Sequence, residues 1–267
     1  NEHSNPNALH TTMRDTIFTN VVHDLDNNTV WWEGLNNNPP KNAIDWKGNK
    51  WDYTKYDKKD KSTCGAHPNS RFTASAKNCP CLSAEFNNPA GVPISAIVFG
   101  GRRAKTAPLV YQSFNWQHGT FVGSIMASET TAAAAGAVGV VRRDPMAMRP
   151  FVGYNMGDYF AHWLEMGKKI PHAPKIFNVN WFRTDDEGNF IWPGFGDNMR
   201  VLLWILARCE DKVGAVETAI GYVPKAEDIN IEGLDGVTID TIKNLLSVDV
   251  ASWKEDCKNI REFYGVI

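Results

Sequence analysis

The sequence lacks the short motifs that most often identify a catalytic or nucleotide-binding protein. It contains no GxxxxGKS or GxxxxGKT segment, so no element of the chain can cradle a triphosphate in the usual way. HExxH and GxSxG segments are also missing, and the seven histidines are scattered along the chain. Function therefore has to be inferred from longer segments and from their order.

The sequence also lacks an excess of charge of one sign and any long apolar run. The sequence contains 28 Lys and Arg residues and 30 Asp and Glu residues. The resulting formal net charge of −2 disfavours nonspecific binding to nucleic acid. No apolar run approaches the length of a membrane span, and no signal peptide is recognisable. We expect a globular protein of one large or two small domains, with neither nucleic acid nor a membrane as partner.

Cysteines are few and form an odd set of five. Only Cys79 and Cys81 are close in sequence, with a spacing that differs from a zinc knuckle and without a matching second pair. Reduced cysteines in a cytosolic protein are the simpler interpretation. We therefore expect a cytoplasmic location, with the mitochondrion as the alternative, and no metal site within this chain.

The residue pattern predicts a mixed α/β fold that is rich in strands early and helical late. It predicts strands within 15–24 and 28–35, a loop over 36–67, a buried strand from Ile94 to Phe99, and strands within 108–116 and 174–182. It predicts helices over 156–169, with Gly167 just after the last turn, and over 198–209, which is apolar nearly all round and capped by Asp197. Two tail helices are expected, capped by Thr238 and by Ser252 with Glu255.

Three polar or glycine-rich segments contain residues that a purely structural role does not require, so they are candidates for ligand binding. Asn69 and Arg71 would project to the same side of an extended chain, which suits an oxyanion, although a surface turn explains them too. Arg102 and Arg103 follow a strand and two glycines that allow close approach to a ligand, with a solvated strand end as the alternative. The small residues from 128 to 139 fit a lid or a short Ala-rich helix.

The fourth segment, residues 180–198, holds five aromatic residues among glycines and acids. Phe182, Phe190 and Phe195 could stack on a planar base, and the amide of Asn198 could read its edge. The same residues also fit a packed hairpin whose turn is "DDEG". We expect a hairpin scaffold in which Trp181 and Trp192 face the core.

Ten segments together resemble one family. In chain order they are "NPNA", "TIFTNV", "HPNSRF", "GVPI", "FGGRR", "PLVYQSFNWQHG", "SETTAA", "DPMAMRPFVGYN", "PKIFNVNWFR" and "WPGFGDNMRVL". They resemble the C-terminal part of GTP-dependent phosphoenolpyruvate carboxykinase, from about residue 5 to the end. The resemblance implies an α/β nucleotide-binding domain of an enzyme that converts oxaloacetate and GTP to phosphoenolpyruvate, GDP and carbon dioxide, in gluconeogenic or anaplerotic metabolism.

The resemblance also implies roles for individual residues. The sites it implies are Asn69, Ser70, Arg71 and Phe151 for substrate and the transferred phosphoryl group, Arg102 for the terminal phosphate of the nucleotide, and Phe182, Phe190, Phe195 and Asn198 for guanine. Arg71 and Arg102 would be catalytic through charge neutralisation. Residues from about 120 to 140 would form the lid, with Glu129 at its hinge, followed by Thr130, Thr131, Ala132, Ala133 and Gly136.

The family uses manganese and magnesium, and the resemblance places their ligands and the phosphate loop outside this sequence. We therefore expect an excised part of a monomeric enzyme that is inactive alone. Two alternatives remain at this point. The chain could be a non-catalytic guanine-nucleotide-binding or interaction module, or a carbohydrate-binding module, since ten tryptophans and many asparagines suit sugar rings.

Overall fold

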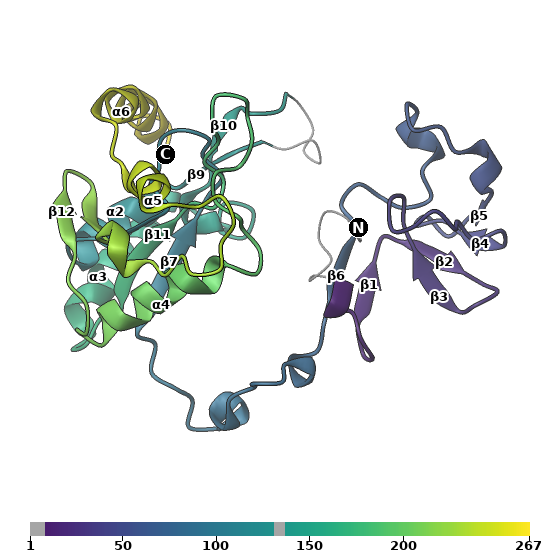
Figure 1. The fold of residues 1–267 in the computed structure, drawn as a ribbon, viewed down its shortest axis with the longest axis horizontal. Helices are drawn as coiled ribbons and strands as arrows, with labels where there is room; N and C mark the ends of the chain where they lie inside the picture. Colours follow the sequence, from purple (N-terminus) through teal and green to yellow (C-terminus); the bar gives the residue numbers. More distant parts are fainter. Residues whose placement is uncertain (1–8, 131–136) are drawn as a thin grey trace. The chain divides into compact units, whose positions relative to one another are not determined.

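The computed structural model describes residues 9–130 and 137–267, and the chain forms two compact units, Asn1–Val92 and Pro93–Ile267 (Figure 1). Strands and helices occur together, which confirms the predicted α/β class. Each unit has its own buried cluster of apolar side chains. Of the predicted lid residues, Thr131, Ala132, Ala133 and Gly136 lie outside the described residues.

The first unit holds two small antiparallel sheets. One pairs β1 with β6, and the other has the order β3-β2-β4-β5. The strands are β1 (Ile17–Thr19), β2 (Val22–Asp24), β3 (Thr29–Trp31), β4 (Ala43–Ile44), β5 (Lys50–Trp51) and β6 (Arg71–Thr73). The predicted strand over 15–24 is divided between the two sheets, because Asn20 has a positive φ of 60°. The predicted loop over 36–67 is wrong in part, since it contains β4 and β5.

A five-stranded sheet forms the centre of the second unit, with the order β12-β13-β8-β11-β7 (Figure 1). Its strands are β7 (Ala96–Gly100), β8 (Val110–Gln112), β11 (Lys175–Val179), β12 (Val216–Thr218) and β13 (Gly221–Val223). A separate hairpin pairs β9 (Ala127–Glu129) with β10 (Val141–Arg143). The strand predicted as buried is an edge strand, with Phe99 buried but Val98 40% exposed.

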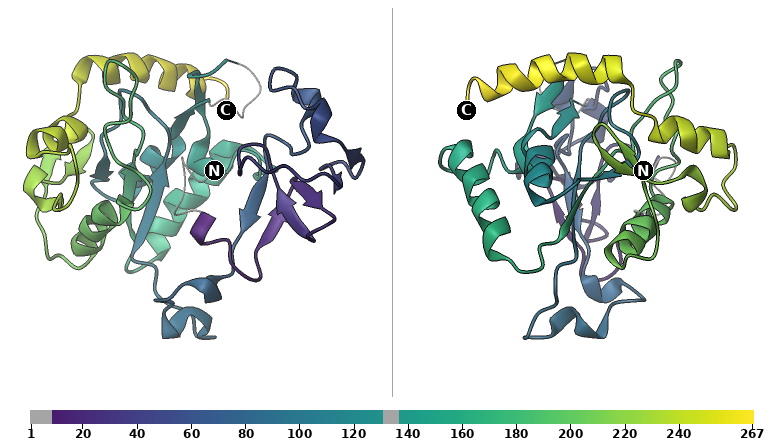
Figure 2. Two further views of the ribbon diagram at one scale, coloured as in Figure 1. Left: turned by 45° about the vertical axis from the view of Figure 1, so that its right-hand side comes forward. Right: turned by 90° about the vertical axis from the view of Figure 1, so that its left-hand side faces the viewer.

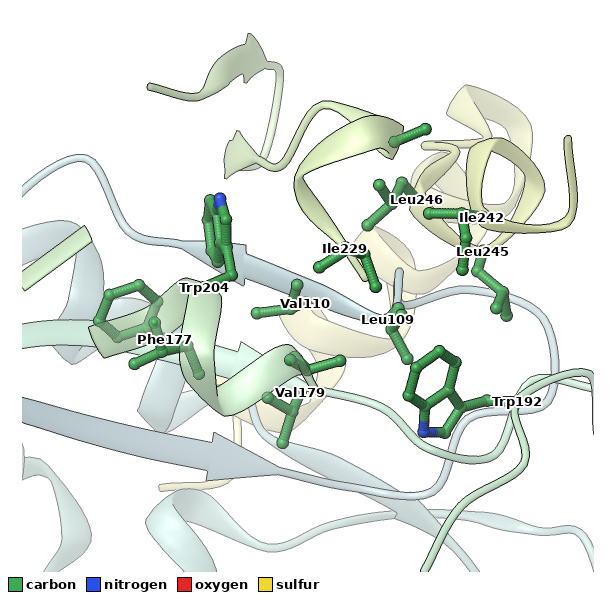
Figure 3. Close-up of a cluster of buried hydrophobic side chains, with 13 residues drawn as sticks. Leu109, Val110, Phe177, Val179, Trp192, Trp204, Ile229, Ile242, Leu245 and Leu246 are labelled. Atoms are coloured by element: carbon green, nitrogen blue, oxygen red, sulfur yellow. The ribbon is translucent and has the colours of Figure 1, made fainter. Parts of the chain in front are cut away.

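Helices cover both faces of this sheet. They are α2 (Trp116–Ser124), α3 (Met156–Lys169), α4 (Asn198–Cys209), α5 (Ile239–Leu246) and α6 (Val250–Tyr264). Successive residues of β11 point to opposite faces. Ile176 packs in a cluster with Trp116 and Trp163 of α2 and α3, whereas Phe177 packs in a cluster with Trp204 of α4. The second cluster is the larger core and also contains side chains of α5 (Figure 3).

Three details of the predicted helices are wrong. Gly167 lies inside α3, where an added Cβ would meet the Trp116 ring at 2.1 Å, so the glycine allows helix packing instead of ending the helix. Helix α4 exposes an apolar stripe, with Met199, Leu203 and Leu206 each more than half exposed. Helix α6, drawn in yellow in Figure 2, begins earlier than predicted and is capped by Asp249, whose side chain accepts from the Ser252 backbone N–H.

Other predictions for the second unit are confirmed. Thr238 caps α5, and its side chain accepts from the backbone N–H of Thr241. Strand β11 and helix α3 lie where their patterns place them. Within the described ranges, no helix combines the length and the apolar character that crossing a bilayer requires.

Candidate functional site

The end of β7 leads into a tight loop that carries Arg102. An added Cβ on Gly101 would lie 2.1 Å from the carbonyl oxygen of Ala127, so this position requires glycine because β9 approaches it closely. The backbone N–H of Arg102 donates to Ser128 Oγ at 3.1 Å, and its carbonyl accepts from the Glu129 N–H at 2.8 Å. The close approach predicted here is therefore made by β9, whose residues hold the Arg102 backbone in place.

The side chain of Arg102 lies on two of the predicted base-binding aromatics. Its guanidinium carbon is 3.9 Å from the ring centre of Phe182 and 5.8 Å from that of Phe190. The two rings meet edge to face, with centroids 5.7 Å apart. A cation over an aromatic face is an attractive arrangement. The structure thus brings one predicted phosphate-binding residue together with two predicted base-binding residues.

Residues 184–190 form the predicted hairpin. Thr184 pairs with Phe190, and the Gly188 N–H donates to the Asp185 carbonyl across the "DDEG" turn, where Gly188 has a positive φ of 86°. The Asn189 N–H donates to the Asp185 carboxylate, and this hydrogen bond lowers the pKa of that carboxyl. The hairpin is confirmed, and it leaves Phe190 57% exposed.

Trp181 and Trp192 of this segment pack in the hydrophobic core, as expected. Trp192 is only 2% exposed, and Trp181 packs against the same cluster. The Trp192 indole N–H donates to Asn198 Oδ1 at 2.8 Å, so this amide oxygen is already used within the protein. Phe195 is 60% exposed, and none of the ring contacts found among the described residues joins it to Phe182 or Phe190. Phe195 therefore stands apart from the other two aromatics.

The predicted lid residues that the structure describes lie at the base of the β9–β10 hairpin. The Glu129 carboxylate accepts from the Ala104 N–H at 2.9 Å, so Glu129 binds the Arg102 loop through both its backbone and its side chain. Thr130 and Val140 are joined by a backbone hydrogen bond of 2.9 Å, and the Thr130 hydroxyl donates to the Ala137 carbonyl. These contacts join Thr130, directly after β9, to Ala137 and Val140 before β10.

The other predicted substrate residues lie elsewhere. In the first unit, Arg71 begins β6, and its Nε donates to Asn69 Oδ1 at 3.0 Å, so the predicted proximity of these two exposed side chains is confirmed. Ser70 closes a turn by donating its N–H to the His67 carbonyl at 2.9 Å. In the second unit, Phe151 follows a short 3-10 helix and is 76% exposed.

Sequence reasoning missed the buried polar residues behind this loop. Asn180, 1% exposed, donates to the carbonyls of Arg103 and Ala107, each at 2.8 Å, and accepts from the N–H groups of Arg103 and Phe182. It therefore joins the Arg102 loop to the aromatic segment. The signal available in the sequence was an amide directly after a strand that is mostly buried. Arg103 is also buried, whereas the pattern had placed it beside Arg102 as a possible ligand.

The metals that the resemblance implies need oxygen, nitrogen or sulfur ligands close together. Within residues 9–130 and 137–267, His, Cys, Asp and Glu side chains form no group of three that could hold a metal ion. The described residues therefore offer no three-ligand set for manganese or magnesium, and the roles below are derived for the chain's own side chains.

Comparison with known proteins identifies the class of domain to which the whole chain belongs. The model of the phosphoenolpyruvate carboxykinase C-terminal P-loop domain matches residues 1–267, so the chain belongs to this family. It is 52% identical over 264 residues to phosphoenolpyruvate carboxykinase [GTP] of Anaeromyxobacter dehalogenans, with 99% of this chain and 43% of that protein covered.

Two further relatives give the same result. The proteins of the same name are 50% identical in Chlamydia caviae and 51% identical in Treponema pallidum, with 98% and 97% of this chain covered. The chain spans 42% of the length of each of these relatives. The expected resemblance is confirmed for the family. The activity of the whole protein is taken up below.

Proposed function

We propose that this chain is the part of a GTP-dependent phosphoenolpyruvate carboxykinase that binds the guanine base and neutralises the transferred phosphate. The complete enzyme would convert oxaloacetate and GTP to phosphoenolpyruvate, GDP and carbon dioxide. The observation that carries this proposal is the family match over residues 1–267. The names and the 50–52% identity of the curated relatives agree with it.

The geometry around Arg102 supports a role in phosphoryl transfer. Such reactions need positioning and charge neutralisation more than covalent help from the protein. Arg102 would neutralise the terminal phosphate, and its backbone is fixed on both sides, by Ser128 and by Glu129. With its backbone fixed, Arg102 can reach the phosphate by side-chain rotation when the nucleotide binds, and a cation that is in place before the reaction stabilises developing charge without further reorganisation. Arg71, held by Asn69, would bind the substrate and the transferred phosphoryl group, and Ser70 and Phe151 would also bind the substrate.

The exposed aromatics support a role in base binding. Phe190 and Phe195 are both more than half exposed, so both rings are accessible to a ligand. Stacking between Phe182, Phe190 and Phe195 would hold guanine. The Asn198 amide N–H₂ would be the group that reads the base, because its oxygen already accepts from Trp192.

The β9–β10 hairpin supports a lid. Glu129 would hold the closed form, and closure would protect an enolate intermediate from protonation by water. We further infer that the parent enzyme is monomeric and cytoplasmic, and the five free thiols agree with the cytoplasmic location.

The carbohydrate-binding alternative fits less well. Such a module presents flat aromatic faces, but Trp46 is the only tryptophan of the described residues that is classed as exposed, at 38%. Trp31, Trp51, Trp192 and Trp204 are buried. The second alternative, a nucleotide-binding module without catalysis, differs from the proposal in one measurable property, which is turnover.

A coupled assay with GTP, oxaloacetate and manganese tests the proposal. The complete protein encoded by the gene is expected to turn over, and the 267-residue chain alone is expected to be inactive. Titration of GDP, followed by the fluorescence of Trp181 and Trp192, measures base binding separately. Binding of GDP without turnover by the complete protein would favour the non-catalytic module. Turnover by the 267-residue chain at the rate of the complete protein would contradict the expected inactivity.

A further inference from the structure

A buried carboxylate, Asp256, lies between two buried arginines in the second unit. Its Oδ1 accepts from Arg103 Nη2 at 2.9 Å and from Arg143 Nη2 at 2.7 Å. The exposed fractions are 8% for Asp256, 8% for Arg103 and 6% for Arg143. Charged side chains are rarely buried to this extent unless they are paired. The three residues therefore form a buried ionic cluster, unlike the solvated ion pairs on the protein surface.

The three residues come from three separate elements. Asp256 lies in the middle of α6, Arg103 follows β7, and Arg143 is the last residue of β10. One turn further along α6, Asn259 Oδ1 accepts from Arg143 Nε at 2.9 Å. Thr106 Oγ1 is the second acceptor of Arg103 Nη2, at 3.3 Å. One face of α6 thus holds the loop after β7 and the return strand of the hairpin at the same time.

Both arginines are close neighbours of the residues described above. Arg103 directly follows Arg102 in the loop. Arg143 pairs with Ala127 in the β9–β10 register, and Ser128 and Glu129 follow Ala127. Ser128 and Glu129 are the residues that hold the Arg102 backbone. A shift of Asp256 would therefore displace the Arg102 loop in two ways, through Arg103 and through Arg143 with the β9–β10 hairpin.

Stability alone gives a poor account of this cluster. It buries two positive charges against one negative charge, and within the described residues Asp256 Oδ2 and Arg103 Nε have no hydrogen-bond partner. Packed apolar side chains usually stabilise an interior at least as well as a buried ion pair does. Buried ion pairs are better suited to selecting one geometry among several, because a shifted arrangement would leave a charge unpaired.

We propose that Asp256 is a positioning residue that fixes the Arg102 loop and the β9–β10 hairpin in a single arrangement. The inference rests on the proposed function for the roles of Arg102 and of the hairpin as a lid. Asp256 itself contacts neither the aromatic rings nor the guanidinium of Arg102. It acts through Arg103 on one side and through Arg143 on the other.

The test uses the complete protein with Asp256→Asn, which keeps the shape of the side chain and removes its charge. We expect kcat to fall by about tenfold or more, because a catalytic group displaced by about 1 Å loses much of its effect. The KM for GTP should change much less, since the aromatic rings are untouched. Hydrogen exchange should become about tenfold faster at the Arg102, Ala104 and Glu129 amides, while the amides of β8 and β11 keep their protection.

Two milder variants test the connection through Arg143 and the connection through Arg103 separately. They also keep the proposal testable if Asp256→Asn does not fold. Asn259→Ala removes one contact of Arg143 and should speed exchange mainly in β9 and β10. Thr106→Ala removes one contact of Arg103 and should speed exchange mainly at 102–104. Glu255→Gln is the matched control, because Glu255 lies on α6 beside Asp256 but pairs only with Lys258 on the surface.

The outcomes are distinguishable from those that test the proposed function. If the unmodified complete protein shows no turnover, the proposed function fails, but the exchange measurement still reports whether Asp256 orders the two segments. The inference is overturned if exchange rises uniformly through the second unit in every folded variant. It is also overturned if Asp256→Asn keeps the kcat of the Glu255→Gln control.

Discussion

The guanidinium carbon of Arg102 lies 3.9 Å from the centre of the Phe182 ring, so a cation covers a face that is proposed to receive a base. The same arginine is proposed to meet a phosphate. Both ligand groups belong to one nucleotide, so binding would move the guanidinium off the ring and toward the phosphate. The fixed backbone of Arg102 allows this change to occur by side-chain rotation alone.

Removal of the Arg102 charge is expected to abolish most of the activity. Arg102→Met should lower kcat by roughly 10³-fold, the size of effect seen when an arginine that neutralises a transferred phosphate is lost. Base binding should persist, because the rings remain. Steady-state kinetics and GDP titration of the complete protein measure the two effects. Arg261→Met, on an exposed arginine of α6, is the control, and an equal loss in both variants would contradict the proposed role.

Truncation of Phe190 is expected to weaken nucleotide binding with little effect on stability. Phe190 is 57% exposed, so Phe190→Ala removes little buried area, yet it should raise the Kd for GDP because base stacking contributes about 1–3 kcal/mol. Calorimetric titration gives the Kd, and thermal unfolding gives the stability. Phe86→Ala serves as control, since Phe86 is 59% exposed in the other unit. An unchanged Kd for Phe190→Ala would remove this ring from the base site.

A methyl group at Gly101 is expected to displace the Arg102 loop. The Ala127 carbonyl oxygen lies 2.1 Å from the position of an added Cβ, and this atom belongs to a paired backbone that cannot rotate away. Gly101→Ala should destabilise the protein by about 1–3 kcal/mol. It should also lower kcat by a larger factor than the factor by which it changes KM. Gly214→Ala, where an added Cβ meets nothing within 4 Å, should leave both unchanged. Wild-type kcat in Gly101→Ala would contradict the close approach.

The strands and helices of the second unit were largely predictable because their patterns are local. A five-residue strand such as β11, with Ile176, Phe177 and Val179, and a capped amphipathic helix such as α5 carry their signals within a few residues. Gly167 shows where this fails. Its role depends on Trp116, which is 51 positions away in sequence, and a glycine near a helix end looks locally like a terminator.

The site was predictable in part for the same reason. Phe190, which is exposed, and Arg102, which is half-buried, were identified as candidates because aromatics and arginines near glycines are unusual on a plain scaffold. Asn180 and Asp256 did not stand out, because nothing local distinguishes a polar residue that will be buried from one that meets solvent. Asp256 reaches Arg103 across 153 positions and Arg143 across 113, distances over which one sequence carries no readable pairing signal.

Acid is expected to remove the stability that Asp256 contributes. Burial raises the pKa of Asp256, but the hydrogen bonds from Arg103 and Arg143 outweigh it, so the pKa in the folded protein lies below its ordinary value of 3.8. A lowered carboxyl pKa gives a contribution that is fully present above the unfolded pKa and is lost as pH falls through the folded pKa. The loss therefore belongs to the range from pH 3.8 downward.

Burial raises the pKa of two phenols near the cluster, those of Tyr111 and Tyr264, so both stay neutral in that range. Wild type should exceed Asp256→Asn by roughly 3 kcal/mol in free energy of unfolding between pH 5 and pH 8, about the value for breaking one side of a buried ion pair. Urea unfolding at a series of pH values should show this difference narrowing below pH 3.8. A difference that stays constant down to pH 2.5 would mean that the Asp256 charge is not what holds the two arginines.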